Sequence, residues 1–115
     1  MDIFWVHMQV GRVVDFFVRP YLKRIAQKSN RPRRVLSDLN LYSMKISPYV
    51  FRVRKYIATQ NIEIELKDIL ESQVHFEELI RHGKVDQVPC LKIGASEYLY
   101  ESKDIVRYLE KSFAN

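Results

Sequence analysis

Residues 41–57 read LYSMKISPYVFRVRKYI, and this stretch indicates the fold of the whole chain. An apolar segment ends at Met44, a short turn follows, and a second segment then spaces its apolar residues as a helix does. Ser47 and Pro48 stand where that helix would begin, and serine and proline are preferred at the N-cap and first helical position. We therefore predict a strand, a turn and a helix over residues 48–60. Ser47 is either an ordinary helix cap or a group that contacts a ligand.

Alternating strands and helices are predicted on both sides of this turn. The predicted strands cover residues 38–44, 62–66, 88–93 and 97–100, and the predicted helices cover residues 48–60, 74–83 and 101–113. The segment IEIEL alternates strictly, which is typical of a strand with one face in water. The order β-α-β-α-β-β-α predicts an α/β fold with a mixed four-stranded sheet, in which the first two strands are parallel and the last two antiparallel.

Apolar spacing also predicts which helix faces are buried. The residues predicted to face the core from the first two of these helices are Val50, Val53, Ile57, Ala58, Phe76, Leu79 and Ile80. The basic residues Arg52, Arg54 and Lys55 are predicted to face solvent. Gly83 is expected to end the second helix.

The chain of 115 residues fits one domain with a short extension. Its single cysteine, Cys90, cannot form a disulfide within the chain, which favours a reducing, cytoplasmic setting. Cys90 lies in an apolar segment, so we expect a buried thiol. No metal site is predicted, because the three histidines stand apart in the sequence, at His7, His75 and His82.

Residues 1–34 form an extension that carries the positive charge. It holds eight Lys or Arg residues against Asp2 and Asp15, whereas residues 35–115 hold eleven basic and twelve acidic residues. The net charge of +5 therefore belongs to the extension, and this argues against a nucleic-acid-binding domain.

Apolar residues recur in the extension every three or four positions, which predicts an amphipathic helix that Pro20 would kink or restart. This stripe consists of Ile3, Val6, Val10, Val13, Phe17, Tyr21 and Ile25. Charged residues interrupt every long apolar run, so no membrane-spanning helix is expected. Two interpretations remain open. The helix lies on a membrane, with the basic RPRR cluster near anionic head groups, or it packs on the domain or on a second copy.

Four motifs in order resemble glutaredoxins and the N-terminal domain of glutathione transferases, which share the thioredoxin fold. The opening stretch resembles their strand, C-P-Y-C motif and helix, and QVPCL resembles their cis-proline loop. YLYES resembles the Glu-Ser pair that holds the γ-glutamyl end of glutathione, and DIVRYL resembles the helix that follows. The resemblance implies a thioredoxin-like domain over residues 38–115. The basic extension resembles that of short bacterial glutaredoxin-like proteins.

This resemblance implies that glutathione is the ligand, and it assigns parts of glutathione to particular residues. Ser47 would contact the thiol, Val88 would pair with the cysteinyl main chain beside a cis Pro89, and Glu101 with Ser102 would hold the γ-glutamyl end. From the residues alone, Ser102 is equally an N-cap of the last helix. Lys45, Tyr49 and Gln87 would lie at the rim of the site.

The chain departs from the family at both redox cysteines, because Ser47 and Val50 occupy their positions. Neither a dithiol nor a monothiol cycle is expected, since both need a thiolate. The all-helical second domain of full transferases also has no counterpart in the sequence. Three functions remain open: a glutathione-binding module without redox activity, a transferase-type enzyme that uses Ser47, or a non-catalytic scaffold or regulatory protein. We expect a cytoplasmic location, with the inner membrane face or a protein as partner of residues 1–34.

Overall fold

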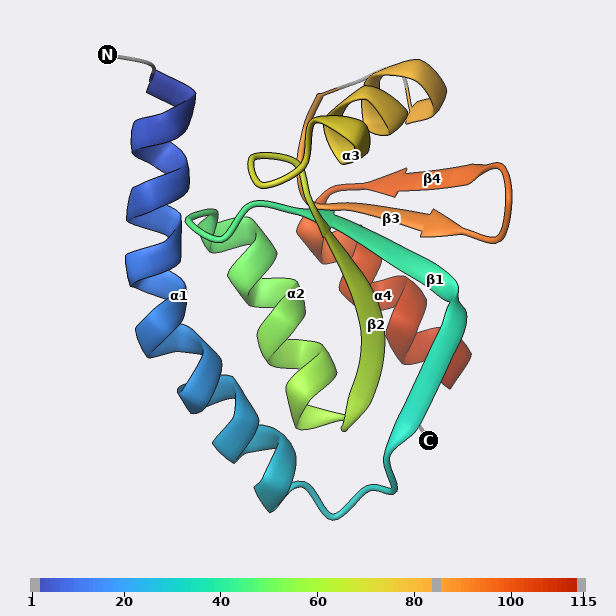
Figure 1. Cartoon of the computed structure of the whole chain (residues 1–115). Coiled ribbons are helices and arrows are strands. Elements are labelled where there is room, and N and C mark those ends of the chain that lie inside the picture. Colours follow the sequence, from blue (N-terminus) through green and yellow to red (C-terminus); the bar gives the residue numbers. More distant parts are fainter. Residues whose placement is uncertain (1–2, 84–85, 114–115) are drawn as a thin grey trace.

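The computed structural model describes residues 3–83 and 86–113 and contains a four-stranded sheet with helices on both faces (Figure 1). The elements in chain order are α1 (Ile3–Lys28), β1 (Arg34–Ser43), α2 (Pro48–Thr59), β2 (Ile62–Asp68), α3 (Gln73–Glu78), the π-helical turn η1 (Leu79–Gly83), β3 (Cys90–Ile93), β4 (Glu97–Tyr100) and α4 (Ser102–Phe113). The predicted α/β class and the predicted order of the domain are confirmed.

The sheet has the strand order β2-β1-β3-β4. β1 runs parallel to β2 and antiparallel to β3, and β3 runs antiparallel to β4, as predicted. β1 begins earlier than predicted, because Arg34 already pairs with Ile62, and the pairing is irregular between Val35 and Asn40. The turn over residues 94–96 joins β3 to β4, and Gly94 adopts the left-handed backbone conformation there (φ 62°).

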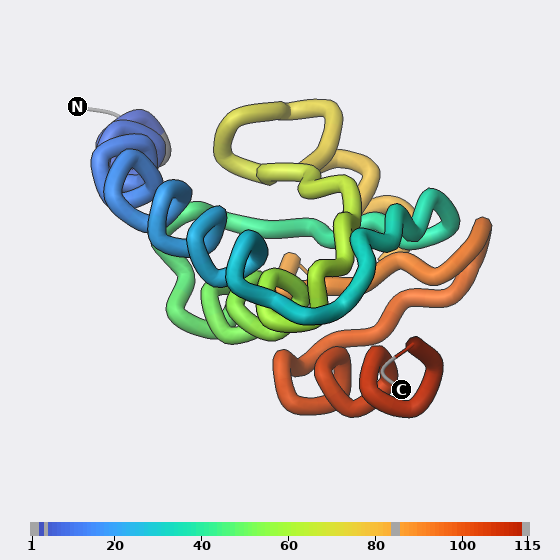
Figure 2. The backbone as a smooth tube through the Cα atoms, turned by 90° about the horizontal axis from the view of Figure 1, so that it is seen from below, coloured from blue at the N-terminus to red at the C-terminus, as the bar shows by residue number. Residues whose placement is uncertain are grey.

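Two apolar clusters hold the helices to the sheet. α2 and α4 cover one face, where Val53, Ile57, Ile105 and Leu109 pack against the strands. α3 and η1 lie on the other face, where Leu79 packs with Tyr42, Ile69 and Cys90 (Figure 2). The predicted core positions Val50, Val53 and Ile57 are buried.

Two predicted helix faces were wrong in detail. Arg54 was predicted to face solvent, but it is buried because it forms an ion pair of 2.7 Å with Asp15 of α1. Ile80 was predicted to face the core, but it is 41% exposed. The chain changes from α to π geometry at Leu79, so the residues after it no longer follow the helical spacing assumed for residues 74–83.

α1 is one continuous helix through Pro20, so the proline does not restart it. It lies beside α2 and contacts the domain through Gly11, Asp15 and Leu22, which are buried (Figure 1). The apolar stripe, for which membrane contact and packing were both left open, points mostly away from the domain, and Phe17 is 70% exposed. Of the described helices, none has the length and apolar character needed to cross a membrane.

Candidate functional site

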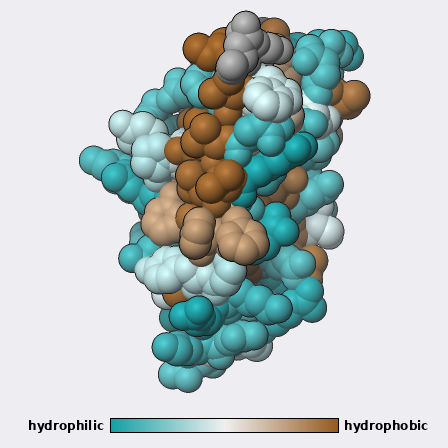
Figure 3. Space-filling view, turned by 60° about the vertical axis from the view of Figure 1, so that its left-hand side comes forward, coloured by the Kyte–Doolittle hydropathy of each residue, from teal (hydrophilic) through white to brown (hydrophobic). Residues whose placement is uncertain are grey.

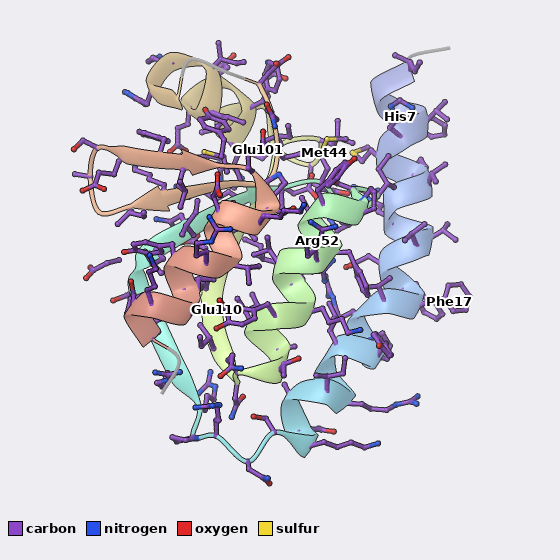
Figure 4. The ribbon with its side chains drawn as sticks, turned by 180° about the vertical axis from the view of Figure 1, so that it is seen from behind. His7, Phe17, Met44, Arg52, Glu101 and Glu110 are labelled. Carbon is purple, nitrogen blue, oxygen red and sulfur yellow. The ribbon has the colours of Figure 1, made fainter. Side chains whose placement is uncertain are left out.

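Three segments of the predicted site lie at one edge of the sheet, because the strand register brings them there. Tyr42 near the end of β1 pairs with Cys90 at the start of β3, and Cys90 pairs with Tyr100 at the end of β4. The turn after β1, the residues before β3 and the residues after β4 therefore meet at the same edge. Met44 and Glu101 belong to two of these segments and lie near this edge, with Arg52 on α2 beside them (Figure 4).

Ser47 caps α2 at this edge. Its Oγ accepts a hydrogen bond of 3.2 Å from the backbone N–H of Val50, and Pro48 occupies the first helical turn. The backbone N–H of Ser47 donates to the carbonyl of Met44 at 3.1 Å, which closes the turn. The cap bond uses only an acceptor lone pair, so the hydroxyl hydrogen of Ser47 is free to be donated to a ligand atom.

Val88 precedes a cis peptide bond to Pro89 in the segment before β3. Val88 is half-buried and packs beside the cluster of Tyr42, Leu79 and Cys90. Among residues 3–83 and 86–113, no backbone hydrogen bond is recorded for Val88, which lies outside the sheet ladder. Half-buried backbone groups normally find partners, so this main chain is suited to pair with an extended peptide ligand.

α4 begins at Ser102, which is its first helical residue and not its N-cap. Ser102 is buried, and its Oγ accepts a hydrogen bond of 3.3 Å from the guanidinium of Arg52 on α2. Glu101 precedes the helix in a left-handed conformation (φ 71°), and its carbonyl accepts the first helical bond from Ile105. The Glu101 carboxylate also accepts a bond of 3.0 Å from Gln87, the neighbour of Val88. These contacts join the three segments.

The N-terminus of α4 has the donors that a carboxylate requires. No side chain among the described residues caps the first N–H groups of this twelve-residue helix. Free N–H groups and the helix dipole favour a bound anion there, and the positive charge of Arg52 adds to this effect. The Glu101 carboxylate beside them is an acceptor for an ammonium group. A γ-glutamyl group carries both charges, so the residues present fit glutathione.

The residues predicted to lie at the rim of the site differ in how accessible their side chains are to a ligand. Tyr49 is 59% exposed beside Ser47, so its side chain is accessible to a ligand. Lys45 is engaged elsewhere, since its ammonium lies 3.4 Å from carboxylate oxygens of both Asp68 and Glu71. An exposed groove of about 700 Å³ starts at this edge beside Pro48 and runs between α2 and α4.

The positions that matter for redox chemistry contain no reactive thiol. Val50 is buried in the core. Cys90 is also fully buried, and burial raises the pKa of its thiol to about 11, although hydrogen bonding with Tyr100 opposes the shift. Within the described ranges, no three His, Cys, Asp or Glu side chains are grouped as a metal site would require.

Arg52 is the site residue that the sequence did not reveal. Helical spacing placed it on an outward face, and the structure shows that this face looks toward Ser102. An arginine five positions after the cap is a weak signal, because basic residues are common on exposed helix faces. Only the packing of α2 beside α4 indicates its role.

A comparison with protein families identifies the domain that carries this site. The family model described as glutathione S-transferase, N-terminal domain, matches residues 41–115, which is more than half of the chain. The match begins inside β1 and leaves α1 outside. No curated protein and no solved structure matches the chain. The chain therefore belongs to the family of glutathione S-transferase N-terminal domains.

Proposed function

We propose that the domain binds glutathione without running a dithiol or monothiol redox cycle. The observation that carries the proposal is the convergence of three partners at one sheet edge: the hydroxyl of Ser47, the main chain of Val88 and the N-terminus of α4. Each suits a different part of the tripeptide, namely the thiol, the cysteinyl main chain and the γ-glutamyl end. Tyr49 and Gln87 would complete the rim.

The absence of redox activity in this proposal rests on side-chain chemistry. The hydroxyl of Ser47 does not ionise near neutral pH, even at a helix N-terminus, so it cannot attack a disulfide as a thiolate does. The valine at position 50 offers no resolving thiol. When bound, glutathione would supply the only accessible thiol at this edge of the described structure.

The contribution of Arg52 offers a direct test by calorimetric titration with glutathione. Arg52→Gln should weaken binding about tenfold, because it removes a charged donor beside the γ-glutamyl carboxylate. Lys28→Gln, which removes an exposed charge at the C-terminal end of α1 and outside the groove, is the matched control and should bind like the unaltered chain. Cysteinylglycine, which lacks the γ-glutamyl group, should bind weakly to both variants. Equal affinity for glutathione and cysteinylglycine would count against the proposal.

A transferase-type reaction is the second candidate, and the free hydroxyl hydrogen of Ser47 favours it. In this role Ser47 would donate a hydrogen bond to the thiolate of glutathione and lower its pKa. The test is conjugation of glutathione to 1-chloro-2,4-dinitrobenzene by the unaltered chain and by Ser47→Ala. The substitution also costs about 1 kcal/mol of helix capping, so folding must be checked by circular dichroism. Turnover that Ser47→Ala leaves unchanged would remove this candidate.

A non-catalytic scaffold remains the alternative if glutathione does not bind. For either role we propose a cytoplasmic location, which the single cysteine supports, because the chain has no second thiol for a stabilising disulfide. α1 would then serve to hold the domain against another surface.

A further inference from the structure

The outward face of α1 forms an apolar strip, which we define as Ile3, Val10, Val13, Phe16 and Phe17. Phe16 and Phe17 are 74% and 70% exposed, and their rings contact each other edge to face. Figure 3 shows the strip as a continuous brown band with hydrophilic residues along both sides and below it. Most large apolar side chains exposed in the described structure lie on α1, whereas the others are scattered over several elements. A contiguous apolar face of this kind marks a contact surface.

Polar contacts fix the rotation of α1 so that the strip points outward. Asp15 forms a buried ion pair with Arg54 of α2, and Arg12 forms two hydrogen bonds of 2.8 Å with Glu71. Gly11 lies against the turn before α2, where a Cβ would come within 3.2 Å of Ile46. The N-terminal half of α1 thus meets the domain mainly through small and charged residues, whereas Leu22 is buried against the domain further along the helix. Within residues 3–83 and 86–113, the side chains of the strip are left largely exposed.

Along its outward side, α1 changes from apolar to basic. After the strip, the last two turns expose Lys23, Arg24 and Lys28, for which no ion pair is recorded among the described residues. Residues 19–34 contain seven basic residues and no acidic residue. A matching partner must therefore offer an apolar layer and negative charge side by side.

We infer that this face of α1 docks onto an anionic lipid surface, with the helix parallel to the membrane. The boundary between acyl chains and head groups supplies both requirements, because the strip enters the apolar layer while the basic turns meet phosphates. A second copy that paired through the same helix face fits less well, since its own residues 19–34 would add seven basic residues and no acidic residue to the contact. The inference does not depend on glutathione binding.

The test is sedimentation of the full chain with vesicles of phosphatidylcholine and phosphatidylglycerol in equal parts. The chain should pellet with these vesicles at low salt, bind less as salt rises, and bind weakly to pure phosphatidylcholine. Phe16→Ser/Phe17→Ser should lower the partition coefficient about tenfold or more. Val35→Ser/Val74→Ser, which alters two apolar residues exposed elsewhere, is the matched control and should leave it unchanged.

A second measurement needs no substitution. Trp5 is the only tryptophan and is 53% exposed beside the strip, so its emission should shift to the blue when anionic vesicles are added. An unshifted emission together with no pelleting at low salt would overturn the inference. Self-association of the unaltered chain without vesicles, abolished by Phe16→Ser/Phe17→Ser, would also overturn it, because the strip would then be a dimer contact.

Discussion

At position 47, where the family has a cysteine, serine retains the helix cap but provides no thiol. The backbone geometry that would activate a cysteine is intact, since position 47 caps α2 and accepts from Val50. Serine keeps this cap and loses the thiolate. The cap role that the sequence predicted is confirmed, whereas contact with a ligand stays a prediction.

Ser47→Cys is therefore expected to introduce thiol–disulfide exchange activity. A cysteine at this helix N-terminus should have a thiol pKa below its usual range, because the helix dipole and free N–H groups stabilise the thiolate. We expect exchange with a glutathione mixed disulfide, measured by a coupled reductase assay, at a rate well above that of the unaltered chain. Ser112→Cys, on the exposed C-terminal part of α4, is the control for an ordinary surface thiol. Identical rates for the two variants would mean that the pocket does not activate a thiol.

Cys90 should be inert in the folded chain. Burial raises the pKa of its thiol to about 11, and the side chain is fully buried, so neither thiolate nor access is present at pH 8. We expect no labelling by iodoacetamide over an hour at pH 8 and full labelling in denaturant, followed by mass spectrometry. Rapid labelling without denaturant would show that β3 opens readily.

At the scale of elements, the attachment of α1 to α2 depends on the buried pair of Asp15 and Arg54. Asp15→Ala leaves the Arg54 guanidinium buried without its carboxylate and should cost about 3 kcal/mol or more in the free energy of unfolding. Asp15→Leu/Arg54→Met removes both charges and should be more stable than Asp15→Ala. Urea unfolding measures the free energy of unfolding of each variant. If the double variant lost as much stability as Asp15→Leu and Arg54→Met lose separately when added together, this account would be contradicted.

A second contact of α1, between Arg12 and Glu71, should make the stability of the folded chain depend on pH. The hydrogen bonds from Arg12 lower the pKa of Glu71 to about 2, with Lys45 contributing, whereas burial opposes the shift. Because this folded-state pKa lies below the usual value near 4.5, the stabilisation is complete above pH 4.5 and is lost as pH falls toward 2. The melting temperature of Arg12→Gln should thus lie below that of the unaltered chain at pH 6. This difference should shrink between pH 4.5 and 2, and a constant difference would exclude the linkage.

The sequence predicted the elements well because their signals are local. Strict alternation identified β2, and Ser47 with Pro48 identified the start of α2. The direction in which α1 faces could not be predicted, because apolar periodicity identifies a face without saying what covers it. Gly11 and Asp15 look unremarkable in sequence, yet they make the contact, and Arg54 lies 39 positions from its partner. Arg52 was missed for the same reason, since its partner Ser102 lies on another helix.

The whole molecule thus has two separate surfaces on one small framework. The sheet edge gathers the residues predicted for glutathione, and α1, which lies beside α2 (Figure 1), carries the exposed apolar strip. Gly11 of α1 touches the turn that precedes Ser47, so the two surfaces are about one helix diameter, ~10 Å, apart. This arrangement would allow a chain docked on lipid to keep its sheet edge accessible.

Binding of glutathione at the sheet edge is tested most directly by an NMR titration. Glutathione added to millimolar concentration should shift the amide resonances of Ser47, Val88 and Ser102 along one saturable curve. Amides of the distant β3–β4 turn near Gly94 should stay in place. Unmoved resonances at the three positions would contradict the account and leave a scaffold without this ligand.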